Sequence, residues 1–231
     1  ERNPAADIEG HDACRKICIL ASLAFGRHVY PEQVHTEGIT NITLGDVEYA
    51  DAWGGVIKLI GSVKRTPEGK VQILVAPMMI PRESQLANVD DVFNGILVRG
   101  DETGDVVFYG KGAGKLPTAS AVVADIIDCV KHVKARKYLY WEDGSPDYVE
   151  DYRKNDTLMY VRVKTADPDD LLEKADALFD GVSRLSRFDA PDDELAFYTE
   201  KLLPEGVIEE KLQQLKTMGG DVQSAVRIAD L

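Results

Sequence analysis

The chain has 231 residues, of which 44% are hydrophobic and 29% are charged, and this is the ordinary composition of a globular protein with one large domain or two small ones. Its net charge of −13 argues against nucleic acid and anionic membranes as partners, because both require a basic surface. No apolar run in the sequence reaches the ~18 residues that a bilayer-spanning helix needs.

The three cysteines, Cys14, Cys18 and Cys129, are odd in number and have no paired spacing. This pattern indicates reduced thiols and a cytoplasmic protein. His11, Cys14 and Cys18 could be taken for metal ligands. Cysteines inside a helix more often pack as small apolar groups, so we expect no metal site.

The first ten residues are expected to form a loop, followed by a helix over residues 11–25 that ends at Gly26. Asp12 and Lys16 are four residues apart and therefore share one face of this helix. From spacing alone, such a pair is most often a solvated ion pair worth ~0.3–0.5 kcal/mol. The apolar run that begins at Ile17 instead places the pair at the entrance to a core.

A short helix is expected over residues 44–53, followed by two hairpins. Strands over 56–64 and 70–77 are joined by the turn sequence TPEG, and strands over 94–99 and 105–109 are joined by the glycine-bounded turn 100–104.

The sequence YGKGAGKLPT links the second hairpin to a helix predicted over residues 117–133, whose apolar positions recur at helical spacing. Backbone N–H groups of a glycine-rich loop at a helix start favour an anion or the close approach of a cofactor. A flexible exit from the hairpin is the alternative interpretation of Gly112, Ala113 and Gly114.

Residues 135–155 are polar, aromatic and irregular, as is typical of a linker or an arm. The remainder predicts a strand, a helix, two strands, a helix and a strand in about 75 residues, which is the ferredoxin-like β-α-β-β-α-β order. Asp167 and Pro168 suit the start of its first helix.

Three separated segments occur in the order found in homoserine dehydrogenases. They are ERNPAADIEGHDACRKICILASLAFG, EGITNITLGDVEYADAWGGVIKLIG and the run from VAPMMIPRESQLANVDD to GKGAGKLPTASAVVADIID. The first resembles the substrate-binding segment of that family, with its Asp-x-x-Gly-x-Asp-x-x-x-Lys pattern. The resemblance implies an α+β fold for residues 1–134, with a mixed or antiparallel sheet covered by helices. Residues 156–231 resemble an ACT-type domain.

The resemblance implies NAD- or NADP-dependent interconversion of L-homoserine and L-aspartate 4-semialdehyde, in the biosynthesis of threonine, methionine and isoleucine. Glu1 and Asp7 match substrate-binding positions. Asp12 and Lys16 match the acid and the base near the reacting oxygen, and Gly112, Ala113 and Gly114 match a loop that faces the cofactor.

The sequence has no G-x-G-x-x-G motif between a strand and a helix, which the dinucleotide-binding domain of the family would carry. We therefore expect this chain to be the substrate half of a longer enzyme and to be inactive alone. The alternative is a non-catalytic fragment that binds an amino acid for regulation or serves in oligomerisation.

The ACT resemblance makes threonine a possible effector. The ACT turn is usually Asp-x-Pro-Gly, whereas this chain has Asp167-Pro168-Asp169-Asp170, which favours a structural or dimerising role. In the family, the helix over 117–133 packs on the dinucleotide domain. Without that domain, the apolar face of the helix must be buried against another surface. We therefore expect a dimer or tetramer, paired through the strands of residues 56–109.

Overall fold

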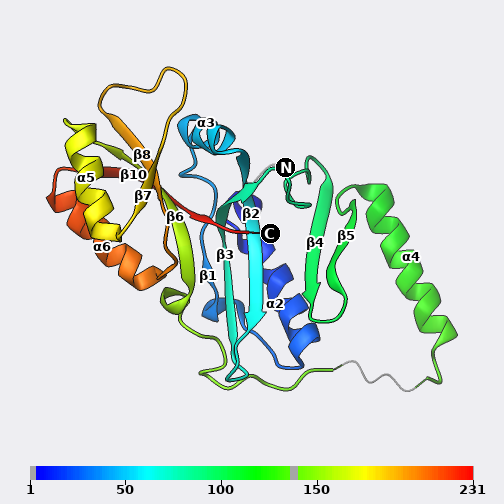
Figure 1. Cartoon of the computed structure of the whole chain (residues 1–231). Helices are drawn as coiled ribbons and strands as arrows, with labels where there is room; N and C mark the ends of the chain where they lie inside the picture. The colour runs from blue at the N-terminus through cyan, green and yellow to red at the C-terminus, as the bar shows by residue number, and fades with distance from the viewer. Residues whose placement is uncertain (1–3, 136–139, 231) are drawn as a thin grey trace. The chain divides into compact units, whose positions relative to one another are not determined.

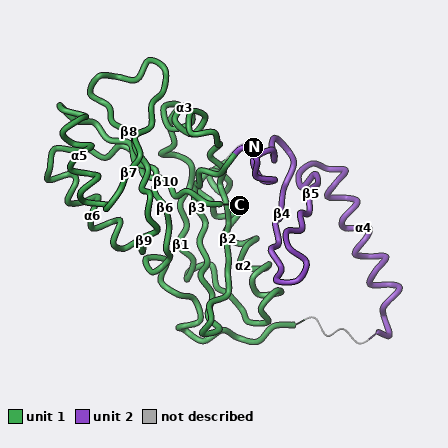
Figure 2. The backbone as a smooth tube through the Cα atoms, viewed as in Figure 1, with its two compact units in different colours: residues 1–81, 140–230 green, residues 82–139, 231 purple. Residues whose placement is uncertain are grey.

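A computed structural model describes residues 4–135 and 140–230 of the chain (Figure 1). The described residues form two compact units (Figure 2). Unit 1 comprises residues 4–81 and 140–230, and unit 2 comprises residues 82–135.

Unit 1 contains a mixed sheet with helices against it, in agreement with the predicted α+β class. Its elements in chain order are α1 (Ala5–Ile8), α2 (His11–Phe25), η1 (Pro31–Gln33), β1 (His35–Thr36), α3 (Leu44–Trp53), β2 (Gly55–Arg65), β3 (Val71–Pro81), η2 (Tyr152–Lys154), β6 (Asp156–Lys164), α5 (Pro168–Phe179), β7 (Val182–Leu185), β8 (Glu194–Thr199), β9 (Leu203–Pro204), α6 (Glu205–Thr217) and β10 (Asp221–Ile228).

The strands of unit 1 form one eight-stranded sheet in the order β1-β3-β10-β6-β8-β7, with β2 paired to β3 and β9 paired to β6. Strands β6, β7, β8 and β10 pair antiparallel, in the order that a β-α-β-β-α-β chain gives in a ferredoxin-like unit. The edge of β10 also pairs parallel with β3 at Arg227–Met78 and Ile228–Met79. The sheet is therefore continuous from the first hairpin to the C-terminal strands.

Unit 2 contains the hairpin of β4 (Phe93–Gly100) and β5 (Gly104–Lys111), followed by α4 (Lys115–Lys131). The strands pair antiparallel along their whole length, from Phe93–Lys111 to Gly100–Gly104. Both predicted hairpins and the helices expected over 11–25, 44–53 and 117–133 are present in the structure.

Two sequence expectations about local structure were wrong. The predicted loop over residues 1–10 contains α1, where the Ile8 N–H donates to the carbonyl of Pro4 at 3.0 Å. The strand expected to end at Pro77 continues to Pro81, paired with β2 throughout. On the edge of β3 opposite β2, the residues before Pro77 pair with β1 and those after it pair with β10. Pro77 lies between these two paired stretches, so its lack of an N–H group breaks no hydrogen bond of the sheet there.

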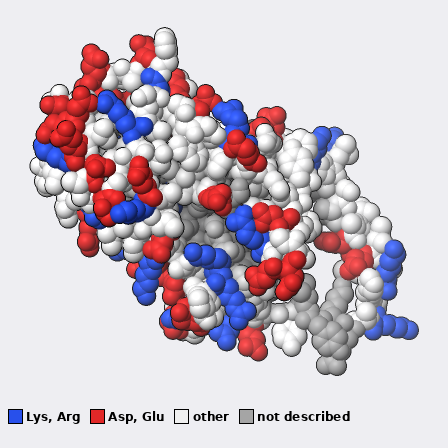
Figure 3. Space-filling model, viewed as in Figure 1, with Lys and Arg blue, Asp and Glu red and all other residues white. Residues whose placement is uncertain are grey.

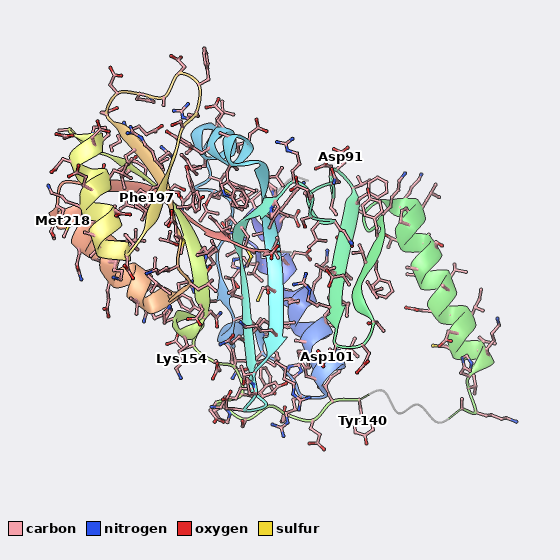
Figure 4. All side chains as sticks on the ribbon, in the orientation of Figure 1. Asp91, Asp101, Tyr140, Lys154, Phe197 and Met218 are labelled. Carbon is pink, nitrogen blue, oxygen red and sulfur yellow. The ribbon has the colours of Figure 1, made fainter. Side chains whose placement is uncertain are left out.

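The two faces of β6 pack against different helices, as the alternation of side chains in a strand requires. Met159, Val161 and Val163 lie in a core with residues of α5 and α6. Phe197 of β8 is fully buried in this core, with its ring centroid 5.9 Å from that of Phe179, and its label lies beside α5 in Figure 4. Tyr160, which points to the opposite face, packs with α3.

A third core lies between α2 and the first hairpin. Cys14, Cys18 and Ala21 of α2 are buried against alternate residues of β3, including Val71 and Ile73. This packing leaves the residues on the remaining faces of α2 free to reach solvent, and Asp12 and Lys16 are among them.

A buried polar network joins α3 to the C-terminal strands. Arg162 of β6 donates from Nε to Asp46 Oδ1 at 2.8 Å and from Nη1 to Glu194 Oε2 at 3.1 Å. Tyr160 donates its hydroxyl to Asp46 at 3.1 Å. Burial alone would raise the pKa of Asp46, but hydrogen bonds from Arg162 and Thr43 outweigh burial and lower it. The network therefore holds a charged carboxylate that is fully buried.

We predict that Arg162→Met lowers the free energy of unfolding by ~3–5 kcal/mol, because the change leaves two buried carboxylates without their shared cation. Urea unfolding followed by circular dichroism measures the change. Arg184→Met is the matched control, since Arg184 pairs with Asp169 on the surface and its loss should change stability by less than ~0.5 kcal/mol. Equal losses in the two variants would contradict the prediction.

Candidate functional site

The predicted acid and base lie side by side near the start of α2. Lys16 Nζ is 2.8 Å from Asp12 Oδ2, and the two side chains are 61% and 41% exposed. Within the described part of the chain this is a solvated pair, so the burial that the sequence had suggested is not supplied by unit 1. The next residue, Ile17, does turn inward and packs beside Gly61 of β2.

Asp7, the described member of the predicted substrate-binding pair, is exposed on α1. Glu1, the other member, lies outside the described residues. Gly10 separates α1 from α2 and has φ +81°, a conformation that favours glycine. We call residues 7–12 the α1–α2 junction, because this short turn carries Asp7 on one side and Asp12 on the other.

The junction packs tightly against the segment that follows β1. The Ile39 N–H donates to the carbonyl of Ile8 at 2.7 Å. A Cβ atom added at Gly38 would lie 2.2 Å from the Ile8 carbonyl oxygen and 2.5 Å from Glu9 Cα. Only glycine allows the two backbones to approach this closely, so the segment around Gly38 fixes the position of the junction.

Next to Gly38, Glu37 is held by a buried arginine that sequence reasoning missed. Arg227 of β10 donates to both carboxylate oxygens of Glu37, at 3.0 and 2.7 Å, and from Nε to Glu205 of α6 at 2.9 Å. His35, which stacks on Tyr152, hydrogen-bonds to Glu37 as well. The available sequence signal was a single arginine between Val226 and Ile228 in an otherwise apolar strand end.

The electrostatics of this group favour a charged Glu37. Burial alone would raise its pKa, but hydrogen bonds from His35 and Arg227 outweigh burial and lower the pKa to about 2. The same segment borders a cavity of about 440 Å³, lined by Glu37, Gly38, residues 40–42, Pro77 and residues 222–226 of β10. Glu37 therefore stays ionised at neutral pH beside a solvent-accessible cavity.

The predicted cofactor loop lies in unit 2, between β5 and α4. A Cβ atom at Gly112 would lie 2.3 Å from Asn94 Nδ2, so a larger residue there would have to displace the Asn94 side chain. Gly114 has φ +109° and precedes α4 without a side-chain cap for the helix. The first N–H groups of α4 are consequently not satisfied by a capping side chain, while Ala113 is exposed beside them.

Unit 2 has a largely apolar exposed helix. The face of α4 that Figure 3 shows carries few charged side chains between its two ends. Large apolar residues at least 47% exposed recur along and just beyond this helix: Leu116, Val122, Val123, Ile126, Ile127, Val130 and Val133. This is the apolar face that the sequence predicted for a helix covered by another domain or chain.

The start of α5 is acidic and already capped. Asp167 accepts a hydrogen bond from the Asp170 N–H at 3.1 Å, and Asp169 and Asp170 pair with Arg184 and Lys174. Figure 3 shows acidic side chains gathered over this helix. A carboxylate ligand at this helix start would meet negative charge and an N–H group that is already bonded.

Among residues 4–135 and 140–230, no group of three or more His, Cys, Asp and Glu side chains is placed to hold a metal ion. Cys14 and Cys18 are both buried in α2, and burial, together with the neighbouring Cys14, raises the pKa of Cys18 to about 12. None of the helices in the described segments is both long enough and apolar enough to cross a bilayer.

Comparison with known proteins gives a consistent result for these segments. Residues 1–127, which contain the α1–α2 junction and the glycine loop, match the family model described as homoserine dehydrogenase. A homoserine dehydrogenase of Pseudomonas aeruginosa is 47% identical over 131 residues, which are 57% of this chain and 30% of that protein. One from Mycobacterium bovis is 36% identical over 190 residues, covering 78% of this chain and 42% of that protein.

The similarity in structure extends over the whole chain. The crystal structure of a homoserine dehydrogenase from Thiobacillus denitrificans is 30% identical, with a TM-score of 0.83, and the match covers 100% of this chain and 55% of that one. The chain thus spans about one third of the curated Pseudomonas relative and about half of the solved structure.

We predict that Glu37 makes the protein lose stability as the pH falls from 4.5 towards 2. Unfolded Glu37 binds a proton near its ordinary pKa of 4.5, whereas folded Glu37 resists protonation down to about 2, so its contribution is present above 4.5 and is lost below it. Urea unfolding at stepwise lower pH measures the loss, which should be smaller in Glu37→Gln. Parallel pH curves for the two proteins would contradict the prediction.

Proposed function

Because this chain belongs to the homoserine dehydrogenase family, we propose that the whole protein interconverts L-homoserine and L-aspartate 4-semialdehyde with NAD or NADP, in the biosynthesis of threonine, methionine and isoleucine. The observation that carries the proposal is the exposed Asp12–Lys16 pair beside the α1–α2 junction, inside the segment matched by the family model.

In this proposal, Lys16 handles the proton at the substrate oxygen. When the semialdehyde is reduced, the Lys16 ammonium donates a hydrogen bond and then a proton to the oxygen that develops negative charge. In the reverse direction the hydroxyl proton leaves through the same position. Asp12, 2.8 Å away, holds the lysine side chain in place. Asp7 and Glu1 supply carboxylates for the ammonium group of the substrate.

We propose that Gly112, Ala113 and Gly114 contact the cofactor. The nicotinamide would donate or accept the hydride at the substrate carbon. The loop residues fit a close approach, because Gly114 has φ +109° and no side chain and the N–H groups at the start of α4 lack a capping side chain. In this proposal they bind a polar part of NAD or NADP, and the larger part of the cofactor site is supplied by a dinucleotide domain.

We further propose a homo-oligomer, a dimer or tetramer, in the cytoplasm. Among the described strands, β2 pairs only with β3, so its other edge is available to the strands of a second copy. The division into residues 1–134, a linker over 135–155 and an ACT-like module over 156–231 is part of this proposal. The capped and acidic start of α5 favours a structural or dimerising role for the module over threonine binding.

We predict that Lys16→Ala in the full-length protein lowers the turnover number by a factor of ~10²–10⁴, the range for loss of a general acid–base group. Its stability should change by less than ~0.5 kcal/mol, because the ion pair is exposed. Homoserine-dependent reduction of NADP, followed by absorbance, measures turnover. Lys174→Ala removes a similar exposed pair with Asp170 in α5 and should leave turnover unchanged. Unchanged turnover in Lys16→Ala would refute the proposed role.

We also predict that residues 1–231 alone do not reduce NAD or NADP with homoserine, because the sequence carries no dinucleotide-binding motif. Addition of the separately expressed dinucleotide domain of a relative should restore measurable activity. Robust activity of residues 1–231 alone would show that the expectation is wrong. The alternative, a non-catalytic amino-acid-binding or oligomerisation fragment, gains support if the longer protein is inactive while calorimetry detects binding of an amino acid to this chain.

A further inference from the structure

We propose that Arg227, which lies in the last strand of the chain, is a positioning residue for the candidate site. Through Glu37 and Gly38 it fixes the backbone of the α1–α2 junction, and this junction carries Asp7 and the start of the helix that bears Asp12 and Lys16. The catalytic consequence of this inference rests on the proposed function. The mechanical part, that Arg227 orders the junction, stands on the contacts alone.

Arg227 is itself held in a fixed position. The residue is 6% exposed, and its guanidinium group lies between Glu205 of α6 and Glu37, with hydrogen bonds to both. Its backbone pairs with Met78 of β3 on one side and Met159 of β6 on the other. The two carboxylates hold the guanidinium group and the two neighbouring strands hold the backbone, so the residue has little freedom to move.

Backbone contacts connect Glu37 to the α1–α2 junction. Glu37 is bound by Arg227 through two hydrogen bonds and continues directly into Gly38. Gly38 is in backbone contact with Ile8 and Glu9, and the Ile39 N–H donates to the Ile8 carbonyl. Gly10 meets the same segment, since a Cβ atom there would lie 3.1 Å from the Glu37 carbonyl oxygen. Movement of Glu37 would therefore be transmitted to both sides of the turn at Gly10.

Besides the Arg227–Glu37 pair, the Glu37 N–H donates to the carbonyl of Val75 in β3 at 2.8 Å, which ties the first residue of the segment 37–41 to the sheet. The cavity of about 440 Å³ lies between this segment and residues 222–226 of β10. Across this gap, the ion pair of Arg227 and Glu37 provides direct contact between the segment and β10. Because the cavity leaves room for the segment to shift, we infer that loss of the Arg227–Glu37 pair loosens the junction rather than only lowering global stability.

The chain contains a matched control for this inference. Arg162 is also a buried arginine of the C-terminal strands that binds two carboxylates, Asp46 and Glu194. Its partner Asp46 lies on α3, and the network leads to Thr43 and Tyr49 rather than to the α1–α2 junction. Arg162 and Arg227 thus share burial and chemistry and differ in the segment that they hold.

Hydrogen–deuterium exchange on the chain, compared between Arg227→Met and Arg162→Met, tests the mechanical part. Arg227→Met should speed exchange in peptides covering residues 7–14 and 37–41 by about tenfold or more relative to the core residues of α5, which contact neither arginine network, because local opening of these peptides becomes easier. Arg162→Met should speed exchange in α3 and leave residues 7–14 unchanged relative to that core. Equal exchange of residues 7–14 in the two variants would overturn the proposal.

Glu37→Gln and Asp46→Asn provide a milder pair in case either methionine variant fails to fold. Each keeps the shape of the side chain and removes one charge from one of the two networks. Glu37→Gln should increase exchange at residues 7–14, and Asp46→Asn should not. If Glu37→Gln leaves the junction as protected as in the wild-type chain, the proposal is overturned on this second measurement as well.

Steady-state kinetics of the full-length protein test the catalytic consequence. Arg227→Met should raise the KM for homoserine by about tenfold while leaving the KM for NADP unchanged, because small displacements of binding groups are costly. Arg162→Met should change neither constant. If the wild-type enzyme does not oxidise homoserine, the proposed function fails while the exchange experiment still decides the role of Arg227. If the wild-type enzyme is active and the KM for homoserine is equal in both variants, the positioning role for catalysis is refuted.

Discussion

The structure of unit 1 depends on the pairing of two buried arginines in its C-terminal strands. A guanidinium group that leaves water is stable in a protein only when carboxylates and further hydrogen bonds compensate for its lost hydration. Arg162 and Arg227 each obtain two carboxylates, one from the C-terminal half of the chain and one from the N-terminal half. This requirement fixes the positions of α3, which supplies Asp46, and of the segment after β1, which supplies Glu37.

Local patterns predicted the elements of this fold well, because the forces that form them act over few residues. The helix over 44–53 is capped by Thr43, whose hydroxyl and N–H both donate to the carboxylate of Asp46 in the first turn. The pairing of Glu37 with Arg227 spans 190 positions, and no local pattern specifies which distant carboxylate an arginine will find. The parallel contact of β10 with β3 was unpredictable for the same reason.

The candidate site shows a different limit of sequence reasoning. An Asp and a Lys four residues apart on a helix have the same geometry whether they take part in catalysis or only form a solvent-exposed ion pair. The exposure of Asp12 and Lys16 in unit 1 is compatible with both interpretations. We favour the catalytic interpretation because the pair lies next to a turn that is held by glycine contacts and by the Arg227–Glu37 ion pair, support that a solvated surface pair does not need.

The change of sequence pattern near residue 155 does not coincide with an end of packing. Tyr49 and Ala50 of α3 and Met79 of β3 are almost completely buried, and they share one core with Tyr160, Ala196 and Val226 of the C-terminal strands. Removal of these strands would expose that apolar surface and separate Asp46 and Glu37 from their arginines. The C-terminal strands therefore complete the core beneath α3, and through Arg227 of β10 they also hold Glu37, next to the segment that contacts the α1–α2 junction.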